Sequence, residues 1–164
     1  MAKRKEVVIS EKKTGNGLFQ KFGEFDSMEE LNAKANELDQ EQLQEFAKEN
    51  GISEDMVEMF MQGILQVLVP DPMTAAIGKL DVEVAALSEK NMEVGNGIAE
   101  YLKQKAMEDD TLARAIRRKG KNLKQICEDV WKEASKRKKG NCAYIPPFEV
   151  FQMARAYYMK GESA

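Results

Sequence analysis

The chain has 164 residues, of which 43% are hydrophobic and 32% charged, and its formal net charge is −3. It contains no histidine and only two cysteines, Cys127 and Cys142. This composition excludes histidine-dependent nucleophiles and histidine metal sites, and two cysteines form neither a disulfide framework nor a four-cysteine zinc site. We therefore expect one compact, mainly α-helical unit in a reducing compartment, which binds another macromolecule and is not an enzyme.

Membrane proteins, exported proteins and metal hydrolases are also disfavoured. The longest apolar stretch, residues 64–70, is far shorter than the roughly 20 residues of a membrane helix. The basic N-terminus is followed by too few apolar residues for a signal peptide. A carboxylate-bound metal needs no histidine, but no distinctive pair stands out among the 28 acidic residues. We expect no membrane association, no metal and no cofactor.

Residues 1–25 predict a short N-terminal β-hairpin or extended segment. Residues 5–10 are rich in β-branched side chains, and residues 12–17 have the composition of a turn. Residues 18–25 would then return as the second strand. Their three phenylalanines recur at every third position, which also suits a helical turn, so both alternatives stay open.

Residues 26–62 predict an acidic helical region. Ser27 and Asp39 each begin a capping-box pattern, which predicts two short helices ending near residues 38 and 50. Ser53 caps a third helix, whose apolar residues at helical spacing continue to residue 68. We expect this third helix to be deeply buried.

Residues 63–164 predict a helical core that includes the C-terminal helix, and all regions are expected to pack as one globular unit. The predicted helices span residues 73–87, 98–106, 111–119, 123–138 and 147–160. Their expected start signals are, in order, Pro72, the pair Gly95 and Gly97, Asp110, Asn122, and Pro146 with Pro147. The side chains expected in the core include Trp131, Phe148, Phe151 and Tyr158.

The charges are strongly segregated along the chain. Residues 26–60 contain eleven acidic and two basic residues, a net charge of −9, and residues 111–139 contain eleven basic and three acidic residues, a net charge of +8. Such fields steer charged partners, but acidic and basic helices also pair within one molecule. The basic stretch shows neither the interleaved aromatic residues of a single-strand binder nor a helix-turn-helix pattern.

Several segments together resemble the PcfK-like family of bacterial mobile genetic elements, which includes anti-CRISPR proteins that inhibit Cas9. The resembling segments are residues 22–32, 80–83, 101–121, 131–143 and 156–159. The resemblance implies a protein of the bacterial cytoplasm that evades host defence by binding a Cas9-type nuclease or its guide complex. It brings no catalytic residues.

Two surfaces are candidates for the partner. An acidic face would imitate nucleic-acid phosphates in the positive channels of the nuclease, and its residues are Asp39, Glu41, Glu45, Glu49, Glu54, Asp55 and Glu58. A basic run would instead contact phosphates of guide RNA or DNA, and its residues are Arg114, Arg117, Arg118, Lys119, Lys121, Lys136 and Arg137. The acidic face is slightly preferred. The alternative function is a conjugation or mobile-element accessory that binds nucleic acid through the basic half.

Overall fold

The computed structural model describes residues 18–162 of the protein. Within these residues the chain is mainly α-helical, as predicted, with eight helices and no strand. The helices are α2 (Met28–Ala35), α3 (Gln40–Glu49), α4 (Glu54–Met61), α5 (Pro72–Ala85), α6 (Glu89–Ala106), α7 (Asp110–Arg117), α8 (Leu123–Lys136) and α9 (Pro147–Met159).

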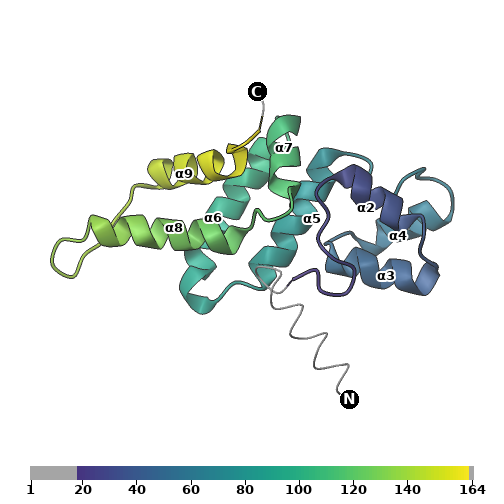
Figure 1. The fold of residues 1–164 in the computed structure, drawn as a ribbon, viewed down its shortest axis with the longest axis horizontal. Helices are drawn as coiled ribbons and strands as arrows, with labels where there is room; N and C mark the ends of the chain where they lie inside the picture. The colour runs from purple at the N-terminus through teal and green to yellow at the C-terminus, as the bar shows by residue number, and fades with distance from the viewer. Residues whose placement is uncertain (1–17, 163–164) are drawn as a thin grey trace, which may run out of the picture.

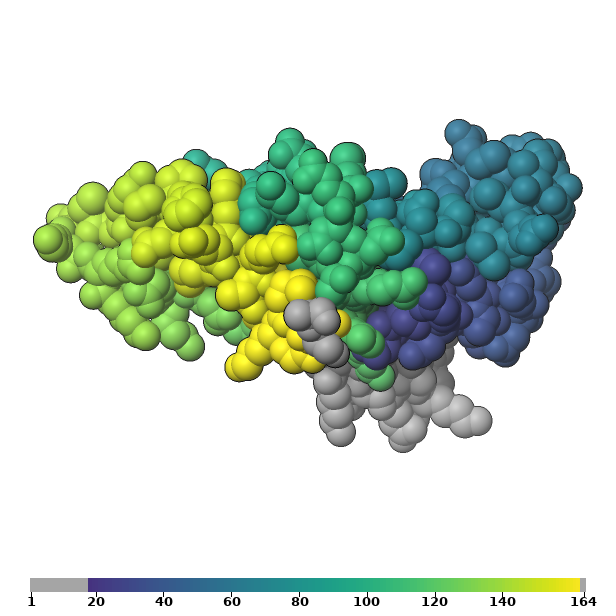
Figure 2. All heavy atoms as spheres, turned by 90° about the horizontal axis from the view of Figure 1, so that it is seen from above, coloured from purple at the N-terminus to yellow at the C-terminus, as the bar shows by residue number. Residues whose placement is uncertain are grey.

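The helices bury two hydrophobic clusters. The larger cluster lies among α5 to α9 and includes Leu80, Leu102 and Ile116. The smaller cluster lies among α2, α3, α4 and the start of α5, and includes Leu43 and Phe46. Figure 1 shows an elongated molecule with α8 and α9 towards one end, α3 and α4 towards the other, and α5 and α7 between. Figure 2 shows residues near 140 and residues near 60 at opposite ends.

A backbone contact between two glycines joins the two parts. Gly51 follows α3 with φ +72°, and a Cβ atom there would lie 2.2 Å from the carbonyl oxygen of Gly78 in α5. A Cβ atom on Gly78 would lie 2.6 Å from the carbonyl oxygen of Asn50. Only glycine permits this approach at both positions, so the end of α3 packs directly on the backbone of α5.

The predicted N-caps at Ser27, Asp39, Ser53 and Asn122 are confirmed. Each side-chain oxygen accepts a hydrogen bond from the backbone N–H three residues later. At Asp39 the capping box is complete, because the side chain of Gln42 also accepts the backbone N–H of Asp39 at 3.1 Å. Such caps each contribute about 1 kcal/mol, which explains why these helix starts were predictable from the sequence.

The predicted hairpin is not supported by the described residues. Residues 18–25 form turns and irregular chain rather than a strand, and residues 1–17 lie outside the described residues. Phe22 and Phe25 pack edge-on against Phe46 of α3, with ring centroids 5.3 and 5.5 Å apart. Burial of aromatic rings on α3 therefore determines this segment, not pairing with a neighbouring strand.

The third predicted helix is shorter than expected and is not deeply buried. α4 ends at Met61, where Gly63 with φ +80° follows, and Ile64 is 65% exposed. Leu68 and Val69 are buried in the loop instead, because the Asn32 side chain accepts the N–H of Val69 and donates to its carbonyl, both at 2.8 Å. The Asn32 side chain, which belongs to α2, thus holds residues 68 and 69 in a non-helical loop.

Two predicted boundaries in the second half were wrong. α6 begins at Glu89 and continues through Gly95 and Gly97, which were expected to precede it. A Cβ atom on Gly95 would lie 2.2 Å from Cδ1 of Leu87, so this glycine serves close packing rather than a break. The N-cap of α7 is Asp109, not Asp110, and its side chain accepts the N–H of Leu112 at 3.1 Å.

Two aromatic side chains expected in the core lie elsewhere. Trp131 is half-buried, and its Nε1 donates to the side chain of Asn91 at 3.0 Å, with Lys90 over the ring. Phe148 is 71% exposed, whereas Tyr158 on the same helix is fully buried. Helical spacing gives the face on which a residue lies, but not whether a neighbour covers that turn.

Candidate nucleic-acid interface

The predicted basic run divides into two groups with different surroundings. We call the first group the α7 cations, which lie on α7 and the turn after it: Arg114, Arg117, Arg118, Lys119 and Lys121. We call the second group the basic tip, which lies at the end of α8 and in its connection to α9: Lys132, Lys136, Arg137, Lys138 and Lys139.

A buried lysine from α5 holds the C-terminal end of α7. Lys79 is 1% exposed, and its Nζ donates to the backbone carbonyls of Ile116 at 3.0 Å, Arg118 at 2.8 Å and Lys121 at 2.5 Å. Carbonyls at a helix C-terminus lack intrahelical donors and favour a cation. Burial lowers the pKa of Lys79 to about 8, and the carboxylate of Glu83 opposes this shift. Lys79 therefore acts as a structural cap.

Two carboxylates balance this buried charge. Oε2 of Glu24 lies 3.6 Å from Nζ of Lys79 and accepts the backbone N–H of Gly120 at 2.6 Å. Glu83 is buried and accepts the N–H of Leu123 at 3.3 Å. Burial raises the pKa of Glu83 to about 7, while Lys79 opposes the rise. The turn after α7 is thus held from both sides.

Arg117 is buried between the two hydrophobic clusters. It is 2% exposed, its Nη2 donates to Oδ1 of Asn50 at 3.1 Å, and its guanidinium lies 5.3 Å from the centroid of the Phe19 ring. Its Nε and Nη1 have no hydrogen-bond partner among residues 18–162. Burial lowers the pKa of Arg117, but arginine stays charged. This side chain is part of the interior and cannot contact a partner without rearrangement.

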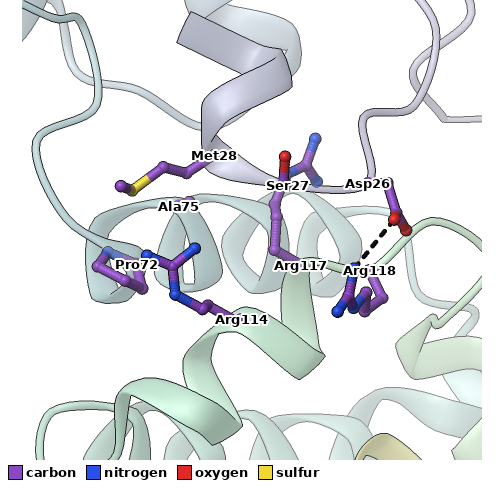
Figure 3. Close-up of a pocket in the computed structure, with 8 residues that line it drawn as sticks. All are labelled: Asp26, Ser27, Met28, Pro72, Ala75, Arg114, Arg117 and Arg118. Carbon is purple, nitrogen blue, oxygen red and sulfur yellow. Dashed lines mark hydrogen bonds and ion pairs between the residues drawn. The ribbon is translucent and has the colours of Figure 1, made fainter. Parts of the chain in front are cut away.

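Arg117 borders a small pocket between α2, α5 and α7 (Figure 3). The other lining residues are Asp26, Ser27, Met28, Pro72, Ala75, Arg114 and Arg118. The pocket has a volume of about 40 Å³, which suits a few water molecules at roughly 10–15 Å³ each and not a nucleotide. Of its three arginines, Arg114 and Arg118 already have carboxylate partners, and Arg117 has none among residues 18–162.

The remaining α7 cations are largely paired within the molecule. Arg114 lies 3.1 Å from the Glu29 carboxylate, and Arg118 lies 3.0 Å from that of Asp26. Lys121 donates to the carbonyl of Tyr157 at 2.7 Å. Lys119 is exposed, and its backbone N–H binds Asp26 at 3.0 Å. At α7, therefore, the basic stretch of the sequence pairs with the acidic stretch.

The residues predicted for the acidic face lie on α3 and α4, but they are not equally available. Glu41, Glu54 and Asp55 are exposed in the first turns of these helices, where carboxylates are favoured by the helix dipole. The other four have partners: Asp39 caps α3, Glu45 pairs with Lys21, Glu49 accepts the N–H groups of residues 21 and 22, and Glu58 accepts a hydrogen bond from the Gln62 side chain.

The basic tip is exposed and rigidly built. Every residue from 135 to 144 is exposed. Lys139 and Cys142 exchange two backbone hydrogen bonds of 2.8 and 3.1 Å, and Gly140 with φ +63° closes the turn between them. Arg137 joins the end of α8 to the start of α9, because it bonds Glu149 at 3.1 Å through Nη2 as well as Glu133. The turn therefore presents its side chains from a fixed base.

Two exposed aromatic residues lie beside these lysines. Tyr144 is 66% exposed and Phe148 is 71% exposed. Neither was predicted as a site residue, and Lys132, Lys138 and Lys139 were counted only as part of the basic stretch. The sequence did contain a signal that Phe148 is exposed. Pro146 and Pro147 mark the start of α9 and so place Phe148 in its first turn, where a side chain has fewer neighbours.

The described part of the chain offers no sign of a metal site or a membrane span. No group of three acidic or cysteine side chains among residues 18–162 is arranged to hold a metal ion. None of the helices in that range combines the length and the apolar character needed to cross a membrane.

Comparisons with known proteins bear on the C-terminal part. Neither a curated protein nor a solved structure matches the chain. Residues 89–163, which contain α6 to α9 and the whole basic tip, match the family described as PcfK-like protein. This match supports the PcfK-like resemblance for the part of the chain that carries the basic tip.

Proposed function

We propose that the protein binds nucleic acid through the basic tip and acts by binding, without catalysis. The observation that carries the proposal is the contrast in pairing. Lys132, Lys138 and Lys139 are exposed and have no ion pair with any residue from 18 to 162, whereas the α7 cations are mostly buried or paired. Free lysines are the groups that release counterions when they bind phosphates.

The local charge supports the same function. Residues 132–149 contain five basic and two acidic residues, a net charge of +3, in a chain whose overall charge is −3. The tip lies at the opposite end of the molecule from the exposed carboxylates of α3 and α4 (Figure 2). This separation orients the molecule as it approaches a polyanion, with the tip forward.

The test is a salt titration of binding to fluorescent DNA and RNA oligonucleotides. We expect K138A/K139A to weaken binding and to reduce the slope of log affinity against log salt by about 1.4 for a single strand, at roughly 0.7 for each lost phosphate contact. The matched control is K34A/K48A, which removes the same charge from α2 and α3 and should leave that slope unchanged. Equal losses in both variants would show a non-specific charge effect and contradict the proposal.

A second candidate function is inhibition of an RNA-guided nuclease through the acidic face. It is favoured by the exposed carboxylates of Glu41, Glu54 and Asp55 on α3 and α4, helices that lie towards the end of the molecule opposite α8 and α9 (Figure 1). Carboxylates presented in this way would compete with nucleic acid for a positive channel.

The test of this second function is a DNA-cleavage assay with guide-loaded Cas9 orthologues. Inhibition when the protein is added before target DNA, reduced in E41Q/E54Q/D55N, would support competition for a DNA-binding channel. Unaltered cleavage in both orders of addition would remove this candidate.

A further inference from the structure

We infer that the nucleic acid bound at the basic tip is single-stranded, and that its bases stack on the rings of Tyr144 and Phe148. This inference rests on the proposed function and adds the class of ligand to it. The two rings are among the most exposed large apolar side chains of residues 18–162. Burial of such a ring against another flat apolar surface favours a complex.

The backbone that carries the rings is held in place before any ligand arrives. Between them, Ile145 is buried in the larger hydrophobic cluster and anchors the segment. Pro146 and Pro147 follow, and proline fixes its own φ angle near −65°. A preorganised backbone loses little conformational entropy on binding, which increases the share of the stacking energy that appears as affinity.

The spacing fits a short stretch of extended strand. Tyr144 and Phe148 are four residues apart, so their Cα atoms are separated by at most about 14 Å. The positive charge is close in sequence, because Lys138 and Lys139 lie six and five positions before Tyr144, and Lys139 pairs with Cys142 across the turn at Gly140. Phosphates can therefore meet lysines while bases meet rings, which is the usual combination in single-strand binders.

A duplex would not use these rings. Base faces in a double helix are covered by the neighbouring base pairs, so only an unpaired or splayed base exposes a π-face to a side chain. Two aromatic rings beside unpaired lysines therefore favour a single strand over a duplex. An acidic protein could also satisfy the lysines and cover the rings, so that partner is one outcome of the test below.

The experiment compares a fluorescent oligothymidylate of about 15 nucleotides with the same strand in a duplex with oligodeoxyadenylate. The substituted proteins are Y144L/F148L, which keeps apolar bulk without a π-face, and Y144F/F148Y, which keeps both rings. The matched control is I64A/M107A, two apolar residues of similar exposure away from the tip. Thermal unfolding of each variant checks that the fold is intact.

We expect the wild-type protein to bind the single strand more tightly than the duplex. Y144L/F148L should lose about tenfold or more in affinity for the single strand for each ring, while Y144F/F148Y and I64A/M107A keep the wild-type affinity. Equal affinity for both ligands, or binding unaffected by Y144L/F148L, would overturn the inference while salt-dependent binding still upheld the proposed function. Binding of neither ligand would overturn both and leave the tip to an acidic protein partner.

Discussion

The α7 cations and the basic tip come from one basic stretch of the chain, yet they have different surroundings. Arg117 is buried, and Arg114 and Arg118 have carboxylate partners from the N-terminal part of the chain. Lys138 and Lys139 are exposed and unpaired among residues 18–162. The difference shows that the density of positive charge along a sequence does not identify a binding surface. The position of the acidic residues after folding decides which cations stay free.

The paired region has a structural task. Lys79 caps α7, Glu24 holds the turn that follows, and Asp26 binds Arg118 and the backbone of Lys119. These contacts connect the smaller hydrophobic cluster to the larger one. Lys138 and Lys139 of the basic tip have no such task, so their substitution should alter binding and leave stability unchanged.

The largest expected effect is on stability, from Lys79→Met. The substitution removes a buried cation whose partners, three carbonyls and the carboxylates of Glu24 and Glu83, then remain without it. We expect the free energy of unfolding to fall by about 3–5 kcal/mol, as when one member of a buried pair is removed. Urea unfolding measures it, with the exposed Lys48→Met as the control, expected within about 0.5 kcal/mol of wild type.

The next largest effect on stability is expected from alanine substitutions at two helical glycines, Gly78 and Gly97, which should have opposite signs. Gly78→Ala should destabilise the protein by about 1–3 kcal/mol, because its Cβ would lie 2.6 Å from the backbone oxygen of Asn50. Gly97→Ala in α6 meets open space and should stabilise by roughly 0.5–1 kcal/mol through helix propensity. Thermal unfolding of the two variants should therefore shift in opposite directions, and destabilisation by both would contradict the packing at Gly78.

The free energy of unfolding should also depend on pH through Glu83, by an amount similar to or smaller than the effects of the glycine substitutions. Its pKa is raised by burial from 4.5 to about 7, so the folded state binds more protons between these values than the unfolded state. Stability from this group is fully present below about pH 4.5 and is lost as the pH rises through about 7. We expect a fall of at least about 1 kcal/mol over this interval. Glu83→Gln cannot titrate, so its unfolding free energy should vary less over the same range.

The smallest effect is expected from Arg118→Ala. Its guanidinium is half-exposed and lies 3.0 Å from Asp26 and 3.1 Å from Glu162. Ion pairs of this exposure contribute at most about 1 kcal/mol. We expect a loss of that size in unfolding free energy and no change in oligonucleotide affinity. A large loss of affinity at unchanged stability would show that the α7 cations bind the ligand.

Much of the fold was predictable because it depends on local signals. The caps at Ser27, Asp39, Ser53 and Asn122 form with residues three positions away, so the sequence alone identifies them. The burial of Leu68 and Val69 in a loop, and the continuation of α6 through Gly95, were not predictable because they depend on contacts with Asn32, Leu87 and Cys127.

The candidate site was predictable only in part. The basic stretch was recognised, but which lysines remain free depends on the distant carboxylates of Glu24, Asp26 and Glu29. Phe148 was expected in the core because it shares the helical face of Phe151 and Tyr158. Its exposure results from the absence of a covering neighbour at the first turn of α9, which periodicity does not encode.

The most direct test of the account compares two double variants from the same basic stretch. K138A/K139A and R114A/R118A remove the same charge, one from the basic tip and one from the α7 cations. The account predicts that binding of a single-stranded oligonucleotide, measured at about 50 mM and about 200 mM salt, is weakened by K138A/K139A and unchanged by R114A/R118A. An equal or greater loss in R114A/R118A would contradict it.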